Sequence, residues 1–161
     1  MWRQTIAWVI LTGAVQAAEC DGPSLRFIES APRDRFELSV GAQDLRGVTV
    51  DLRGSKGRLI FDTAQGGTGV EVFQPLRDEG GINGAAVTDG AEVLTVALRE
   101  GRAGGQAAFS IDVDDRLRTS DLGQIRVTGG EMAGAAAIFE TAQGVILEAV
   151  FDAQNLAQAC P

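Results

Sequence analysis

The sequence consists of short runs in which apolar and polar residues alternate, separated by turns rich in glycine, aspartate and asparagine. In the run from Arg35 to Val40, for example, Phe36 and Leu38 fall on one face of an extended chain and Glu37 falls on the other. We count about nine or ten such runs, spaced roughly 8–12 residues apart, and no convincing helix of normal length. This pattern predicts an all-β fold, a two-sheet antiparallel β-sandwich (Ig-like or jelly-roll-like), with a closed barrel as the runner-up.

The predicted strands are the alternating runs, namely Leu25–Glu29, Arg35–Val40, Leu45–Arg53, Arg58–Asp62, Val70–Phe73, Ala91–Leu98, Ala108–Asp115, Gln124–Thr128 and Val145–Phe151. Met132–Phe139 is apolar on both faces, which fits a buried strand or an alanine-rich helical turn, and its neighbouring glycines favour a strand. The short polar link Gly54–Gly57 suggests a hairpin between the strands that flank it. Pro75–Gly90 reads as a surface loop or ragged edge, and Ala153–Ala159 has mild helical propensity.

Residues 1–18 predict a signal peptide and residues 19–161 a single β-sandwich domain. Arg3 supplies the positive charge of the leader, and Ile6–Leu11 forms its apolar stretch. Val15–Ala17 fits the small-residue pattern of a cleavage site, which places the cut after Ala17 or Ala18. The apolar stretch is far shorter than the roughly 20 residues that span a bilayer, so the mature chain is expected to have no membrane span. We therefore expect an exported protein, either periplasmic or extracellular.

The net charge limits the possible partners of the protein, and the two cysteines predict a disulfide. The formal net charge of −8 argues against nucleic acid and anionic lipid surfaces as partners, and it is compatible with cations. The two cysteines, Cys20 and Cys160, lie near the two ends of the mature chain, without a C-x-x-C motif or any histidine. In an oxidising compartment this isolated pair predicts one disulfide that closes nearly the whole mature chain into a loop.

The chain offers few groups for catalysis, so we expect a protein that is not an enzyme. Without histidine there is no Ser-His-Asp or Cys-His arrangement, and no G-x-S-x-G elbow or P-loop is present. Apart from Trp2 and Trp8 in the leader there is no tryptophan, and tyrosine is absent. The seven phenylalanines fall mostly at inward strand positions, which indicates core packing and not a surface for stacking sugars.

The best candidate site is one for calcium, whose ligands are six to eight oxygens from carboxylates, carbonyls and water. Asp112 and Asp114 share one face of a predicted strand and Asp115 follows at its end, while Asp121 and Asp62 could join from loops. The spacing lacks the glycine and the distal glutamate of an EF-hand. The competing interpretation is a solvated strand face with no ligand.

Five short segments of the sequence, taken together, resemble those of a known protein family. They are Ala-Pro-Arg-Asp-Arg-Phe at 31–36, Val-Thr-Val-Asp-Leu at 48–52, Leu-Ile-Phe-Asp-Thr at 59–63, Gly-Val-Glu-Val-Phe at 69–73 and Phe-Ser-Ile-Asp-Val-Asp-Asp at 109–115. In these segments the chain, from about Leu25 to Cys160, is similar to small exported bacterial proteins called aggregation factor core protein. The resemblance implies a role in cell-surface adhesion, by analogy with animal aggregation factors whose action depends on calcium, and it brings no catalytic residues.

The sequence and the resemblance together predict an exported, non-enzymatic binding or cell-surface adhesion module with calcium as a candidate cofactor. Its partner would be an unknown protein or glycan at the cell surface. One alternative is a carbohydrate-binding module or a glycoside hydrolase that works through two carboxylates. A further alternative is a structural accessory protein of the envelope.

Overall fold

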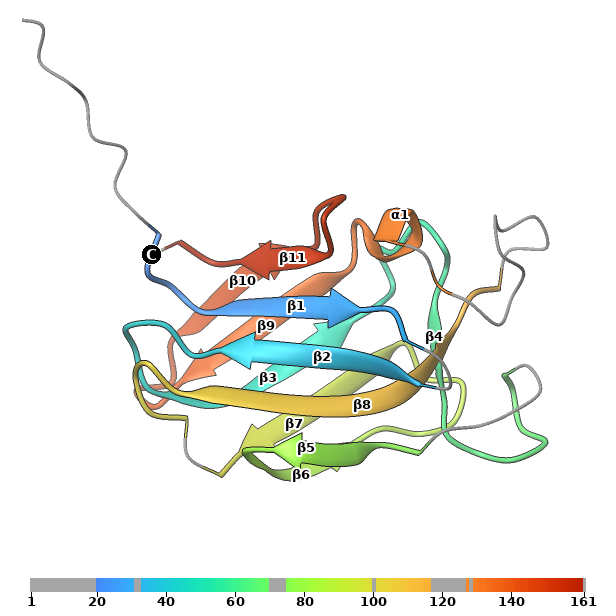
Figure 1. Ribbon diagram of the computed structural model, residues 1–161, viewed down its shortest axis with the longest axis horizontal. Helices are drawn as coiled ribbons and strands as arrows, with labels where there is room; N and C mark the ends of the chain where they lie inside the picture. Colours follow the sequence, from blue (N-terminus) through green and yellow to red (C-terminus); the bar gives the residue numbers. More distant parts are fainter. Residues whose placement is uncertain are drawn as a thin grey trace, which may run out of the picture.

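The computed structural model describes residues 20–30, 33–69, 75–99, 101–116, 127 and 129–160. Within these residues the chain forms one six-stranded and one five-stranded antiparallel sheet, which pack face to face (Figure 1). The helix in this part of the chain, α1 (Gly129–Met132), has four residues. The predicted all-β, two-sheet sandwich is therefore confirmed.

The six-stranded sheet, here called sheet A, has the predicted strands Arg35–Val40 and Ala108–Asp115 near its centre. Its strands are β1 (Ser24–Ile28), β2 (Asp34–Ser39), β4 (Ile60–Asp62), β5 (Arg77–Gly80), β8 (Gln106–Asp114) and β11 (Leu156–Gln158). Their order is β11-β1-β2-β8-β4, and β5 also pairs with β8. The first half of β8 pairs with β2 and β5, whereas its last three residues pair with β4.

The five-stranded sheet, sheet B, lies behind sheet A in Figure 1. Its strands are β3 (Leu45–Asp51), β6 (Ile82–Ala86), β7 (Val93–Leu98), β9 (Ala136–Thr141) and β10 (Ile146–Val150), in the order β10-β9-β3-β7-β6. The central strand β3 pairs with β7 on one side and β9 on the other.

The core fills the space between the sheets, and a row of phenylalanines crosses sheet A on its inner face. Phe27 lies opposite Phe36, which in turn lies opposite Phe109, with ring centroids 5.2 Å and 5.0 Å apart. Aromatic pairs at such distances add about 0.5–1.5 kcal/mol beyond the area that they bury. On sheet B, Val48 and Val50 of β3 are buried in the same hydrophobic cluster as this row of phenylalanines.

The predicted hairpin across Gly54–Gly57 is wrong, because the two strands that flank it lie in different sheets: β3 in sheet B and β4 in sheet A. The link makes two turns, in which the N–H of Ser55 donates to the carbonyl of Leu52 and the N–H of Arg58 donates to that of Ser55, and it is also held by a segment distant in sequence. Backbone N–H groups of Lys56 and Gly57 donate to the carbonyls of Ala133 and Glu131, beside α1. The chain crosses from one sheet to the other at this point.

The predicted loop Pro75–Gly90 contains two strands, β5 and β6. Nearly all their side chains are exposed, so the apolar alternation that identifies a strand in a sequence is missing. The strands exist through backbone pairing with β8 and β7 at the edges of the two sheets. Gly80, the last residue of β5, and Gly81, which precedes β6, both have positive φ, and here the chain passes from sheet A to sheet B.

Of two other predictions of local structure, one is wrong and one is confirmed for part of its range. The tail Ala153–Ala159 is not helical but forms β11, because Ala157 is buried in the core and the backbone pairs with β1. Met132–Phe139 begins at the last residue of α1 and continues, past Gly134, into β9, so its strand character is confirmed in its second half. The predicted strand Val70–Phe73 and most of Gln124–Thr128 lie outside the described residues.

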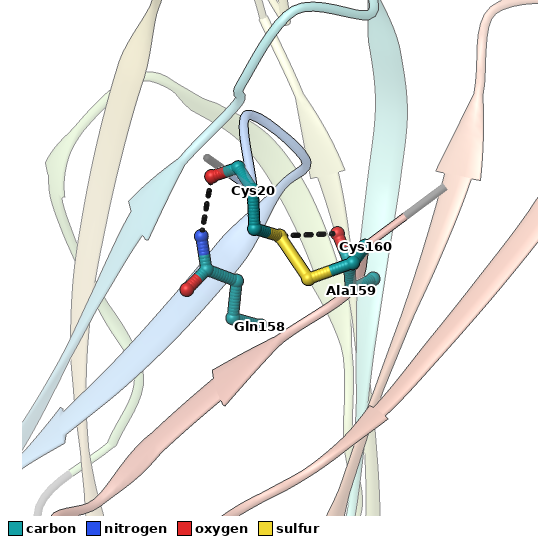
Figure 2. Close-up of a disulfide and its surroundings, with 4 residues drawn as sticks. All are labelled: Cys20, Gln158, Ala159 and Cys160. Carbon is teal, nitrogen blue, oxygen red and sulfur yellow. Dashed lines mark hydrogen bonds between the residues drawn. A yellow bond between two sulfur atoms is a disulfide. The ribbon is translucent and has the colours of Figure 1, made fainter. Parts of the chain in front are cut away.

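The predicted disulfide between Cys20 and Cys160 is present, with their Cα atoms 5.3 Å apart and 140 positions between them in the sequence. Figure 2 shows its surroundings, in which the side-chain amide of Gln158 donates to the carbonyl of Cys20 at 2.9 Å. The adjacent pairing of β1 with β11 brings the two ends of the described chain together. Among the described residues no helix has the length and apolar character needed to cross a membrane, and the predicted signal peptide lies outside them.

Replacing both cysteines, Cys20→Ser with Cys160→Ser, should lower the free energy of unfolding by about 4 kcal/mol, because the unfolded chain regains the entropy of an open loop. The strands should remain, since the pairing of β1 with β11 does not require the bond. Chemical denaturation followed by circular dichroism measures the difference. An unchanged denaturation midpoint would contradict the prediction, and non-reducing mass analysis of the wild type checks that the bond is formed.

Candidate functional site

Four of the five aspartates predicted as calcium ligands lie on or beside the second half of β8, and these four are buried. Asp112 is 7% exposed, Asp114 and Asp115 are each 1% exposed, and Asp62 on β4 is 3% exposed. The interpretation of these residues as a solvated strand face is therefore wrong. The reason is that β4 pairs with this half of β8, and the chain that follows β4 packs against it at Gly69.

Two of these carboxylates converge on one point. A Cβ atom added to Gly69 would lie 2.2 Å from Oδ2 of Asp62 and 2.4 Å from Oδ2 of Asp114, so the two oxygens are close neighbours. Asp112 lies directly opposite Asp62 in the pairing of β4 with β8. Like charges at such a position destabilise a sheet. The arrangement therefore favours either a cation or protonation of a carboxyl group.

A further buried carboxyl, Asp34 at the start of β2, belongs to the same cluster. Burial raises its pKa to about 8, against the opposing effect of the backbone N–H groups of Ser30 and Val113, and the negative charge of Asp112 adds to the rise. The side chain accepts from the N–H of Ser30 at 3.3 Å. Sequence reasoning missed Asp34 because it precedes the predicted strand Arg35–Val40, and only the pairing of β2 with β8 brings it near Asp112.

Asp89, also missed, fixes the loop that covers the cluster. Its carboxylate accepts from the backbone N–H groups of Thr63, Ala64 and Thr68 and from the hydroxyl of Thr68. These donors hold the pKa of Asp89 well below its ordinary value. Burial, by contrast, raises the pKa of Asp62, with a smaller contribution from Asp89.

The structure therefore brings together Asp62, Asp112 and Asp114 and adds Asp34. Asp115 is buried directly after the end of β8, and Asp121 lies outside the described residues. Within residues 20–116 and 127–160, where described, no group of three or more Asp, Glu, Cys or His side chains is arranged to hold a metal ion. What the described residues offer a hard cation is the pair of converging oxygens at Gly69.

The chain was compared with protein-family models, curated proteins and solved structures, and none of them matches it. The resemblance to aggregation factor core proteins therefore stays a prediction.

Asp34 should make the protein less stable as the pH rises from about 4 to about 8. Its pKa in the folded state lies above the value of 3.8 for an ordinary aspartate, so the folded state binds more protons than the unfolded state in this range. The contribution of Asp34 is fully present below pH 4 and is lost at about 1.4 kcal/mol per pH unit until the folded pKa is reached.

The variant Asp34→Asn keeps the acceptor for Ser30 and cannot ionise. As the pH rises from 5 to 7, the free energy of unfolding of the variant should increase relative to that of the wild type. Denaturation at several pH values in EDTA measures this difference. Parallel pH profiles for the two proteins would show that Asp34 is ionised across the whole range and would contradict the assigned pKa.

Proposed function

We propose that this protein is an exported, non-enzymatic binding module of the cell surface whose fold is stabilised by calcium. The observation that carries the proposal is the convergence of Oδ2 of Asp62 and Oδ2 of Asp114 on the space left by the missing side chain of Gly69. A glycine at that position leaves room for the two carboxylates, and a larger residue would fill the space between them.

Calcium fits the chemistry of this donor set better than zinc does. Its ligands are oxygens in a flexible geometry, whereas zinc sites in proteins are built mainly from cysteine and histidine. The chain has no histidine, and both cysteines are in the disulfide. In this proposal Asp62 and Asp114 bind the ion, and backbone carbonyls and water complete its set of ligands.

The energetics of the cluster support a cation. Burying ionised carboxylates costs several kcal/mol for each ion unless an opposite charge or hydrogen bonds offset the loss of hydration. Asp62 and Asp112 face each other directly across two paired strands, and Asp34 lies beside them. A divalent cation would stabilise the ionised form of several of these groups at once.

Export and the absence of catalysis rest on other features. A single disulfide that joins the two ends of the domain suits an oxidising compartment, because such bonds are rare in the cytosol. The resemblance to aggregation factor core proteins suggests adhesion at the cell surface and supplies no catalytic residues. The partner in this proposal is a protein or a glycan of the envelope.

Millimolar calcium should raise the unfolding midpoint of the purified protein relative to EDTA. Extracellular calcium sites have dissociation constants of about 10⁻⁴–10⁻³ M, so 10 mM calcium should add about 1.4–2.7 kcal/mol to the free energy of unfolding. Thermal melts with calcium, with magnesium and with EDTA measure the effect. Identical midpoints in calcium and EDTA would remove the ion from the proposal.

Two alanine variants make the test specific to the site. In Gly69→Ala the new methyl group takes the space between the carboxylates, so the calcium-induced shift should be lost. Gly84→Ala is the matched control, because nothing lies within 4 Å of the Cβ position there and neither glycine has a positive φ. A full calcium shift in Gly69→Ala would place the ion elsewhere.

The adhesion part of the proposal needs a separate measurement. The labelled protein should bind to intact cells of its source organism in calcium and in EDTA alike, because the proposed role of the ion is to stabilise the fold. Release of the bound protein by EDTA would show that adhesion requires the ion itself, and no binding in either condition would contradict a role at the cell surface.

A further inference from the structure

A hollow of about 590 Å³ lies on the outer face of sheet A, the sheet nearest the viewer in Figure 1. It extends from β11 and β1 across β2 and β8 to β5. Asp62, Asp112, Asp114 and Asp115 are not among its lining residues, so the hollow is separate from the carboxylate cluster.

The charges that line the hollow balance. Arg26 and Arg35 contribute two positive charges, and Glu37 and Glu79 contribute two negative charges. Nε of Arg35 lies 3.0 Å from Oε1 of Glu37, and Glu79 accepts a hydrogen bond of 2.7 Å from the hydroxyl of Ser110. In a protein with a net charge of −8, the lining of this hollow carries no net formal charge, which favours neither cations nor anions.

The polar groups of the hollow match those of a polyol. Guanidinium groups only donate hydrogen bonds and carboxylates only accept them, whereas Gln106 and Ser39 do both. A sugar carries many hydroxyl groups, each of which both donates and accepts. Planar side chains such as those of arginine, glutamate and glutamine can engage two neighbouring hydroxyl groups at once.

The strand pairing sets these groups in rows across the sheet. Ser24 lies opposite Ser39, and Ser39 lies opposite Gln106. In the next row on the same face, Arg26 lies opposite Glu37, and neighbouring strands are about 4.8 Å apart. The rows therefore present donors and acceptors at regular intervals along a surface long enough for more than one sugar ring.

The floor of the hollow admits a ring at close range. Ala107, Ala108, Gly80 and Gly81 line it on β8, on β5 and just after β5, and none has a side chain larger than a methyl group. The carbon-bound hydrogens of a sugar can contact these small residues while its hydroxyl groups reach the charged side chains around them.

A peptide is a poorer match for this surface. Peptides bind by adding a strand to an open sheet edge or by inserting apolar anchors into pockets. Here β1, β2 and β8 each have a paired strand on both sides, so their backbone groups are already hydrogen-bonded. Among the lining residues on these strands, the large apolar side chain is that of Leu38, which is 2% exposed.

We propose that this hollow binds a neutral oligosaccharide through Arg26, Arg35, Glu37 and Gln106. The inference rests on the proposed role as a binding module and assigns its ligand class, but it does not depend on the calcium site. Binding relies on hydrogen bonds to planar polar side chains, without an aromatic platform among the lining residues.

The test uses the full mature protein and a printed panel of neutral oligosaccharides, namely glucans, mannans, galactans and xylans, followed by titration calorimetry with the best binder. Arg26→Ala and Glu37→Gln should each weaken binding about tenfold, since each removes a charge-assisted hydrogen bond. Binding should be equal in calcium and EDTA.

Sheet B provides a matched control pair. Arg46 and Glu140 are a second cross-strand pair of opposite charge, exposed on the other sheet, with 3.7 Å between Nη1 and Oε1. Arg46→Ala and Glu140→Gln should leave sugar binding unchanged.

Several results would overturn the inference: no binding of any neutral oligosaccharide at millimolar concentration, equal losses in the variants of the two sheets, or binding of charged glycans or peptides alone. If the calcium-induced shift in melting is present while sugar binding is absent, only the ligand assignment fails. If neither is observed, the proposed function fails as well.

Discussion

The alternation of β8 is the constraint on which the rest of the structure depends. Its period of two places Phe109, Ile111 and Val113 in the core, and Asp112 and Asp114 on the opposite face. A slip of one residue in the pairing of β8 with β2 would exchange these faces and move carboxylates into the sandwich. The row of phenylalanine rings that β8 completes makes such a slip costly, because it would separate stacked rings as well as bury charge.

The same strand borders two surfaces of different character, and what covers each half of β8 decides the difference. Gln106 and Ala108, in the first half, line an open hollow between β2 and β5. The second half pairs with β4 and is covered near Gly69, in a loop that hydrogen bonds to Asp89 hold in place. One alternating sequence thus yields exposed polar groups at one end and buried carboxylates at the other.

The sequence alone predicts the features that depend on the local alternation of apolar and polar residues and on the placement of the cysteines. The all-β class, the disulfide and the shared face of Asp112 and Asp114 follow from period-two patterning and cysteine placement. It was insufficient wherever a partner distant in sequence decides the outcome. The edge strands β5 and β6 carry no apolar pattern and form only by pairing, and Asp34 becomes a buried acid only because β2 lies beside β8. The burial of Asp62 and Asp114 likewise depends on contacts that alternation does not encode.

The two surfaces meet at the row formed by Arg35 and Ser110, which are paired across β2 and β8. Arg35 forms an ion pair with Glu37, on the side of the hollow, and Ser110 donates to Glu79, also a lining residue. From Asp112 to Gln106 the strand runs six residues, about 20 Å, which is more than twice the screening length at physiological salt. A cation among the carboxylates would therefore have little direct electrostatic effect at the far end of the hollow. Ligand binding in the hollow is therefore expected to be the same with and without the ion, although both surfaces belong to β8.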